Sequence, residues 1–210
     1  MSALYYCRQT TTACKGIPYP SKTHPYRYGT SGCVYTSGCG VCASLMALRN
    51  STTRVFNTRQ WTHRCLGMGA RAAEGTDMAV VARYMKEKYG LDYAVTTDMD
   101  RLVAHLKQGY KAIVNVSGGG KMLFSNSGHY VLAAGIDKNG NLIILDPYWY
   151  DGKFTLTAAR RKYTRVKNGR EVYVRPGDLK GDVLSLWLFT PKRNVCLLYT
   201  SPSPRDRSVS

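Results

Sequence analysis

A cysteine flanked by glycines stands at the start of an apolar segment of this 210-residue chain. Cys39 lies between Gly38 and Gly40, and the Ala, Leu and Met residues that follow predict a helix over 40–49. A helix N-terminus carries unpaired N–H groups and roughly +0.5 of an elementary charge, which favours thiolate over thiol. The same N–H groups can hold an oxyanion. This position predicts a nucleophilic thiol.

A histidine and an aspartate lie at the open end of one predicted hairpin. An apolar strand begins at His129, Asn139-Gly140 predicts a type I′ turn with positive φ at both residues, and the return strand ends at Asp146. Because the open ends of an antiparallel hairpin lie side by side, we expect Asp146 to orient the His129 imidazole. With Cys39 these residues supply a nucleophile, a base and an orienting group for acyl transfer.

These motifs resemble a known family. The Gly-Cys-Gly at 38–40, the Gly-His-Tyr-Val-Leu at 128–132 and the Asp-Pro at 146–147 are similar to papain-like cysteine peptidases related to the bacteriocin-processing, double-glycine-leader peptidases. The likeness runs over about residues 25–147 and is greatest to stand-alone members in prophages and Gram-positive cell-wall hydrolases. It implies Cys39 as nucleophile, with no metal or other cofactor.

The resemblance also implies the other two roles, His129 as general base and Asp146 as the orienting residue. Family members commonly carry a glutamine a few residues before the nucleophile, and residues 33–37 contain none. The chain also has a valine where the family usually has a proline after Gly-Cys-Gly. Candidate oxyanion donors are therefore the backbone N–H at the nucleophile and the hydroxyls of Tyr35 and Ser37.

A glycine-rich segment precedes the histidine strand. Gly118, Gly119 and Gly120, with the residues through Ser127 and Gly128, predict a flexible loop that borders the substrate cleft. As a phosphate-binding loop the triple glycine is a poor match, because no Gly-Lys-Ser/Thr and no helix follow it.

The cysteines leave a zinc site open as an alternative. The residues that could contribute are Cys7, Cys14, Cys33, Cys39, Cys42, His63 and Cys65. Strong zinc sites pair two short clusters on knuckle turns. Here the Cys-x-x-Cys pair lies at a helix start and Cys65 lies in a second predicted helix, so the spacing does not favour metal.

Length and hydropathy predict one soluble domain over residues 1–195, with a loop-rich N-terminal arm over 1–37. No apolar run approaches the ~20 residues of a membrane span, so we expect no membrane insertion. The N-terminus lacks the pattern of a signal peptide. We therefore expect synthesis in the cytoplasm, and action at the cell wall only after release if the protein is a lysin.

Residues 196–210 resemble the translation of a sequencing-library adapter, and we expect a disordered, non-native tail there. The net charge is +17, of which this tail supplies +1. Such an excess concentrates a protein near polyanions such as cell-wall polymers. Basic residues gather at 160–170, where Asn168-Gly169 predicts a second hairpin with a solvated face; nucleic-acid binding is the less favoured interpretation of this run.

The predicted elements change in kind along the chain. Helices are expected at 40–49, at 58–65 with Asn57 as N-cap, at 76–89 closed by Gly90, and from Asp98 to Gly109. Strands are expected at 112–116, 129–136, 142–145, 164–166, 171–174 and 183–189. N-terminal helices packed on a C-terminal antiparallel sheet constitute an α+β fold, which the resemblance identifies as papain-like.

Three functions fit these observations. The first is a cysteine peptidase or amidase that hydrolyses peptide bonds, with peptidoglycan as the substrate. The second is a leader- or protein-processing peptidase of the same chemistry. The third is a basic, non-catalytic module that binds zinc or nucleic acid.

Overall fold

The computed structural model describes residues 4–192. The strands are β1 (Leu91–Thr96), β2 (Lys111–Val116), β3 (His129–Ile136), β4 (Leu142–Leu145), β5 (Thr164–Lys167), β6 (Glu171–Val174) and β7 (Val183–Pro191). The helices are α1 (Thr12–Lys15), α2 (Val34–Ser37), α3 (Cys39–Ser51), α4 (Thr58–Gly67), α5 (Met78–Tyr89), α6 (Met99–Lys107), α7 (Ala158–Tyr163) and α8 (Pro176–Leu179). Short 3-10 turns cover Lys153–Thr155 and Lys180–Asp182.

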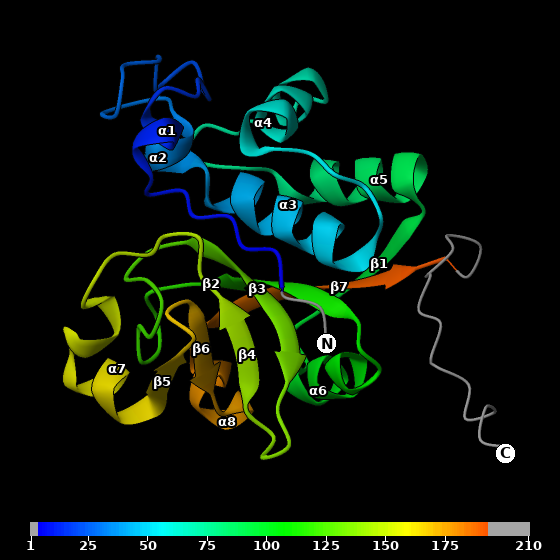
Figure 1. Ribbon diagram of the computed structural model, residues 1–210, viewed down its shortest axis with the longest axis vertical. Coiled ribbons are helices and arrows are strands. Elements are labelled where there is room, and N and C mark those ends of the chain that lie inside the picture. Colours follow the sequence, from blue (N-terminus) through cyan, green and yellow to red (C-terminus); the bar gives the residue numbers. More distant parts are fainter. Residues whose placement is uncertain (1–3, 193–210) are drawn as a thin grey trace, which may run out of the picture.

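All seven strands form one antiparallel sheet in the order β1-β7-β2-β3-β4-β6-β5. Helices α3, α4 and α5 lie over one face of the sheet, and α6 lies against the other (Figure 1). The predicted α+β architecture is confirmed, and each predicted strand is present. Strand β1 was not predicted, because its residues after Leu91 are half-buried or exposed without alternation, and the strand depends on pairing with β7, about a hundred residues later.

Local capping signals account for the helix boundaries. Asn57 caps α4, and its side chain accepts a hydrogen bond from the Gln60 N–H at 2.8 Å. Gly90 closes α5 in the left-handed conformation with φ 64°. Asp98 caps α6 through bonds from two backbone N–H groups. These helix ends could be predicted because each depends on the residue at the end itself: a capping side chain at Asn57 and Asp98, and a glycine that tolerates positive φ at Gly90.

The turn between β3 and β4 differs from the prediction. Only Gly140 has positive φ, at 79°, so the type I′ assignment for Asn139-Gly140 is wrong. The Asp137 carboxylate instead accepts hydrogen bonds from the N–H groups of Asn139 and Asn141, at 2.9 and 2.8 Å. This side chain organises a longer turn that still joins the two predicted strands.

The hairpin between β5 and β6 has the predicted turn, since Asn168 and Gly169 have φ of 52° and 66°. The basic run before it is not wholly a hairpin. Its first residues belong to α7, which Thr157 caps by accepting from the Arg160 N–H. The helix turns the Arg160 side chain inward, where it is only 8% exposed.

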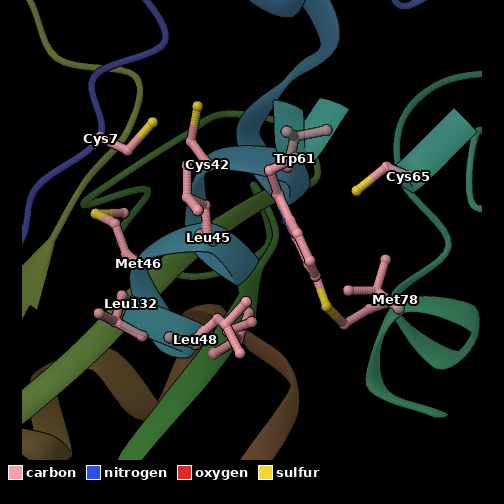
Figure 2. Close-up of a cluster of buried hydrophobic side chains, with 14 of the residues drawn as sticks. Cys7, Cys42, Leu45, Met46, Leu48, Trp61, Cys65, Met78 and Leu132 are labelled. Atoms are coloured by element: carbon pink, nitrogen blue, oxygen red, sulfur yellow. The ribbon is translucent and has the colours of Figure 1, made fainter. Parts of the chain in front are cut away.

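Both faces of the central strand β3 are buried. Leu132 and Ala134 pack against the layer of α3, α4 and α5, and Val131 and Ala133 pack on the α6 side. A strand covered on both faces is mainly apolar, as this one is after His129 and Tyr130. Figure 2 shows α3 side chains between the sheet and the other helices; the labelled residues are Cys7, Cys42, Leu45, Met46, Leu48, Trp61, Cys65, Met78 and Leu132.

The disordered tail predicted for residues 196–210 lies outside the described residues. Within residues 4–192, the structure has no helix with both the length and the apolar character that crossing a bilayer requires. Residues 4–37 contain two one-turn helices, α1 and α2, joined by irregular backbone.

Candidate active site

Cys39 is the first residue of α3, and Gly38 precedes it as the N-cap. The two flanking glycines permit close packing around the thiol. A Cβ on Gly38 would lie 2.4 Å from the Val34 carbonyl oxygen, and a Cβ on Gly40 would lie 2.5 Å from the Thr76 Cβ. Any larger residue at either position would push the start of the helix away from its neighbours.

His129 and Asp146 meet at the ends of β3 and β4. Nε2 of His129 lies 2.8 Å from Oδ1 of Asp146, and the two residues are 6% and 0% exposed. This bond leaves Nδ1 of the imidazole free to exchange a proton with the Cys39 thiol. The Tyr148 backbone N–H donates to the same Asp146 oxygen at 2.9 Å, which fixes the carboxylate in this orientation.

The ionisation of these groups is coupled. Burial raises the pKa of the Cys39 thiol. A hydrogen bond and charge interaction with His129, together with hydrogen bonds from the backbone N–H groups of Tyr130 and Gly40, outweigh burial and bring the net pKa below its ordinary value. Burial lowers the pKa of His129, but Asp146 and Cys39 outweigh it and raise that pKa to about 9. The site therefore favours a thiolate beside an imidazolium.

The carboxylate of Asp146 stays ionised despite its burial. Burial alone raises the pKa of Asp146, and the neighbouring charges of His129 and Lys153 reverse that effect, so the net pKa lies below its ordinary value. Lys153 was not predicted as part of the site. Its Nζ lies 2.6 Å from Oδ2 of Asp146 and donates to the Tyr148 carbonyl at 2.8 Å, with the side chain 2% exposed.

Gln9, like Lys153, was not predicted as part of the site. Its side-chain Nε2 donates to the Tyr35 carbonyl at 3.1 Å, and its backbone N–H donates to the Pro147 carbonyl at 2.9 Å. Its Oε1 is buried and has no hydrogen-bond partner in the described part of the chain. Gln9 therefore connects the helix turn before Cys39 with the segment after Asp146, although it lies thirty positions before Cys39 in the chain.

The two hydroxyls predicted as oxyanion donors lie in α2, just before Cys39. The Lys15 ammonium sits 5.1 Å from the Tyr35 ring centroid, and Ser37 Oγ lies 3.4 Å from Thr36 Oγ1. Over residues 4–192, neither hydroxyl forms a hydrogen bond to Cys39. Their role stays a prediction.

The predicted cleft loop joins β2 to β3. A Cβ on Gly118 would lie 2.2 Å from the Asn126 carbonyl oxygen, so this glycine permits close approach within the loop. Gly120 lines a cavity that also includes Asn126, whereas Gly119, Ser127 and Gly128 do not line it. Only part of the predicted segment therefore faces an open space.

The alternative of a zinc site has no support from a ligand cluster in the described part of the chain. Among residues 4–192, no three His, Cys, Asp or Glu side chains converge as a metal site. The six cysteines of this part of the chain are free thiols, five of them buried. Cys42 packs in the core one turn after Cys39 (Figure 2).

The sequence profile described as the Peptidase_C39 like family matches residues 14–173, a span that includes Cys39, His129 and Asp146. The chain belongs to this family. As a Peptidase_C39-like protein it is a cysteine peptidase that acts on peptide bonds, and the predicted relation to the bacteriocin-processing peptidases is confirmed.

A solved structure with some similarity is the peptidase domain of Streptococcus ComA, a bifunctional ABC transporter involved in a quorum-sensing pathway. The identity to this Peptidase_C39-like chain is 15%, the TM-score is 0.49, and the match covers 73% of this chain and 91% of that domain. No curated protein sequence matches the chain.

Proposed function

We propose that this peptidase hydrolyses peptide bonds of bacterial peptidoglycan through a Cys39–His129–Asp146 triad. The observation that carries the chemistry is the buried 2.8 Å bond between His129 and Asp146, next to a thiol of lowered pKa at the start of α3. The net charge of +17 supports the wall as the substrate, because teichoic acids and peptidoglycan are anionic. Release from the cell would bring the protein to that polymer.

The reaction begins with the thiolate of Cys39 attacking the carbonyl carbon of the scissile amide. The resulting oxyanion collapses as His129 gives its Nδ1 proton to the leaving amine, which leaves a thioester on the sulfur. His129 then takes a proton from water, and the hydroxide attacks the thioester. A carboxylic acid product departs and the thiolate is restored, while Asp146 keeps the imidazole in one orientation.

Gln9 is our candidate for the oxyanion donor, together with the backbone N–H of Cys39. Its amide is buried and borders the turn before Cys39, where Nε2 donates to the carbonyls of Tyr35 at 3.1 Å and Val34 at 3.5 Å. The family resemblance supports a glutamine in this role. If Tyr35 or Ser37 supplies the donor instead, Tyr35→Phe or Ser37→Ala will lower kcat and Gln9→Ala will not.

The test of the proposed function is digestion of purified cell walls followed by mass spectrometry of the muropeptides. Wild-type protein should release a new amine and a new carboxylate at one bond, and Cys39→Ala should release neither. Walls left intact by folded wild-type protein would refute the peptidoglycan assignment.

A leader-processing role is the second candidate, favoured by the family relation to bacteriocin-processing peptidases. A synthetic precursor with a Gly-Gly junction distinguishes the two. Cleavage after the glycine pair, together with inactivity on walls, would select leader processing.

A further inference from the structure

A cavity of about 660 Å³ is lined by Tyr148 and Lys153, the two residues that connect it to the His129–Asp146 pair. Tyr148 forms part of its wall, and the Tyr148 ring stands edge-on to the imidazole with the two centroids 6.3 Å apart. Lys153, which is bonded to Asp146, also lines it. The volume lies in the range that small ligands and substrate side chains occupy.

The charged residues that line this cavity are all basic. They are Lys121, Lys153 and Arg160, and no Asp or Glu belongs to the lining. Lys121 is paired with Asp178, at 3.6 Å, and Lys153 with Asp146, at 2.6 Å. The two lysine charges therefore have partners within the protein.

Arg160 differs from these lysines, since within residues 4–192 no carboxylate lies within 4 Å of its guanidinium. Its Nε donates to the Met122 carbonyl and its Nη1 to the Lys153 carbonyl, both at 3.2 Å, and the residue is only 8% exposed. Asp182 joins the same hydrogen-bond network at Met122: its two carboxylate oxygens accept from the backbone N–H groups of Met122 and Leu123.

The carbonyl partners satisfy two donors of Arg160 but leave its charge without a counter-ion. A buried charge without an opposite charge is costly, and a ligand carboxylate removes that cost. A guanidinium is also well shaped to bind a carboxylate through two parallel hydrogen bonds. Its Nη2 makes no hydrogen bond to the described residues and remains for such a ligand.

We propose that this cavity is a subsite for a carboxylate on the part of the substrate C-terminal to the cleaved bond, recognised by Arg160. The side follows from the chemistry: His129 must pass its proton to the leaving amine, so the leaving part of the substrate lies on the imidazole side of the site, and Tyr148 links that side to the cavity. Tyr148, 41% exposed, supplies an apolar wall for the rest of that residue. The inference rests on the proposed role of His129.

Binding is measured first, in the Cys39→Ala protein, where no turnover occurs. The probes are N-acetyl-Ala-Glu-amide, its Gln counterpart, N-acetyl-Ala-Ala with a free C-terminus, and the amide of that dipeptide, each followed by saturation-transfer NMR. We expect the carboxylate probes to bind at least about tenfold more tightly than their amides, the size of one charge-assisted hydrogen bond. The Glu probe and the free C-terminus distinguish a side-chain carboxylate from a terminal one.

Variants then assign the effect to Arg160. Arg160→Met should abolish the preference for carboxylate, Arg160→Lys should retain part of it, and Arg161→Met is the matched control, because Arg161 is exposed and does not line the cavity. Equal binding of acid and amide by the Arg160-containing protein would overturn the proposal, whether or not Arg160→Met folds. So would absence of binding by every probe, or an equal loss in Arg161→Met.

Failure of the subsite and failure of the proposed function give different results. Walls that resist the wild-type protein, with carboxylate probes still bound through Arg160, would refute the peptidoglycan assignment alone. Wall hydrolysis that depends on Cys39, with no preference between acid and amide probes, would refute the subsite alone.

Discussion

Asp146 and Asp182 are both buried, at 0% and 1% exposed, and yet their surroundings differ. Asp146 at the end of β4 bonds to two titratable side chains, His129 and Lys153. Asp182 before β7 accepts from two backbone N–H groups, at 3.1 and 2.9 Å, in the loop that carries Met122. A carboxylate among titratable partners can take part in proton chemistry, whereas one among backbone donors anchors a loop.

The loop that Asp182 anchors contains one residue, Met122, in a disfavoured backbone conformation. Met122 has φ 55°, a conformation that side-chain-bearing residues seldom adopt, and it is 45% exposed. Arg160 holds the carbonyl of the same residue. The Asp182 region therefore shapes a wall of the cavity, while the Asp146 region controls the charge beside it.

The largest effect should come from Cys39→Ala. We expect kcat/KM to fall by about 10⁴-fold or more, because no other group can form the thioester. The free energy of unfolding in urea should stay close to that of wild type, since the change removes one sulfur at the end of a helix. A variant that retains a tenth of wild-type activity would contradict the assignment of the nucleophile.

Asp146→Ala should lower kcat by about 10²- to 10⁴-fold, because the imidazole loses its orienting partner. It should also destabilise the fold by about 3–5 kcal/mol, since Lys153 would be left buried without an opposite charge. Steady-state kinetics and urea unfolding measure the two effects. A loss of stability with unchanged kcat would give Asp146 the same anchoring role as Asp182.

The pH profile of kcat/KM should be bell-shaped. Activity should fall at low pH as Cys39 becomes protonated, and at high pH as His129 loses its proton, with the upper limb near the raised pKa of about 9. The stability from His129 is fully present below its unfolded pKa of about 6.5 and is lost as pH rises through about 9. The stability from Asp146, whose pKa is lowered, is lost as pH falls through that lowered value.

Lys153→Met tests whether the lysine acts through Asp146. Removal of this positive charge should raise the pKa of both His129 and Cys39, so both limbs of the profile should move to higher pH. A shift of about one unit corresponds to about a tenfold change in rate at a fixed pH on a limb. A uniform loss of activity with unmoved limbs would mean that Lys153 serves only packing.

The smallest effect on activity should follow from Asp182→Asn. The amide loses one acceptor for the N–H groups of Met122 and Leu123, so the free energy of unfolding should fall by about 1–3 kcal/mol. Activity should fall only a few-fold, and the pH limbs should not move. A shifted limb would show that Asp182 also influences the titration of the site.

Sequence signals were sufficient where the relevant partner lies close in the chain. The helix after Gly38, the cap at Asn57 and the strands that carry His129 and Asp146 follow from local periodicity and turn residues. The turn between those strands departs from its local signal: the Asp137 carboxylate organises a turn other than type I′, and the strands that it joins are the predicted ones.

The sequence by itself determined the fold class and brought His129 and Asp146 to the ends of neighbouring strands, since a hairpin joins its strands over a few residues. Only the tertiary structure decided that Lys153 and Arg160 are buried and that Gln9 reaches the site. A lysine or arginine in a basic run has the same local pattern whether it is solvated or buried. Which of them enters the interior depends on contacts between segments far apart in the chain, and on charge partners that exist only after those segments meet.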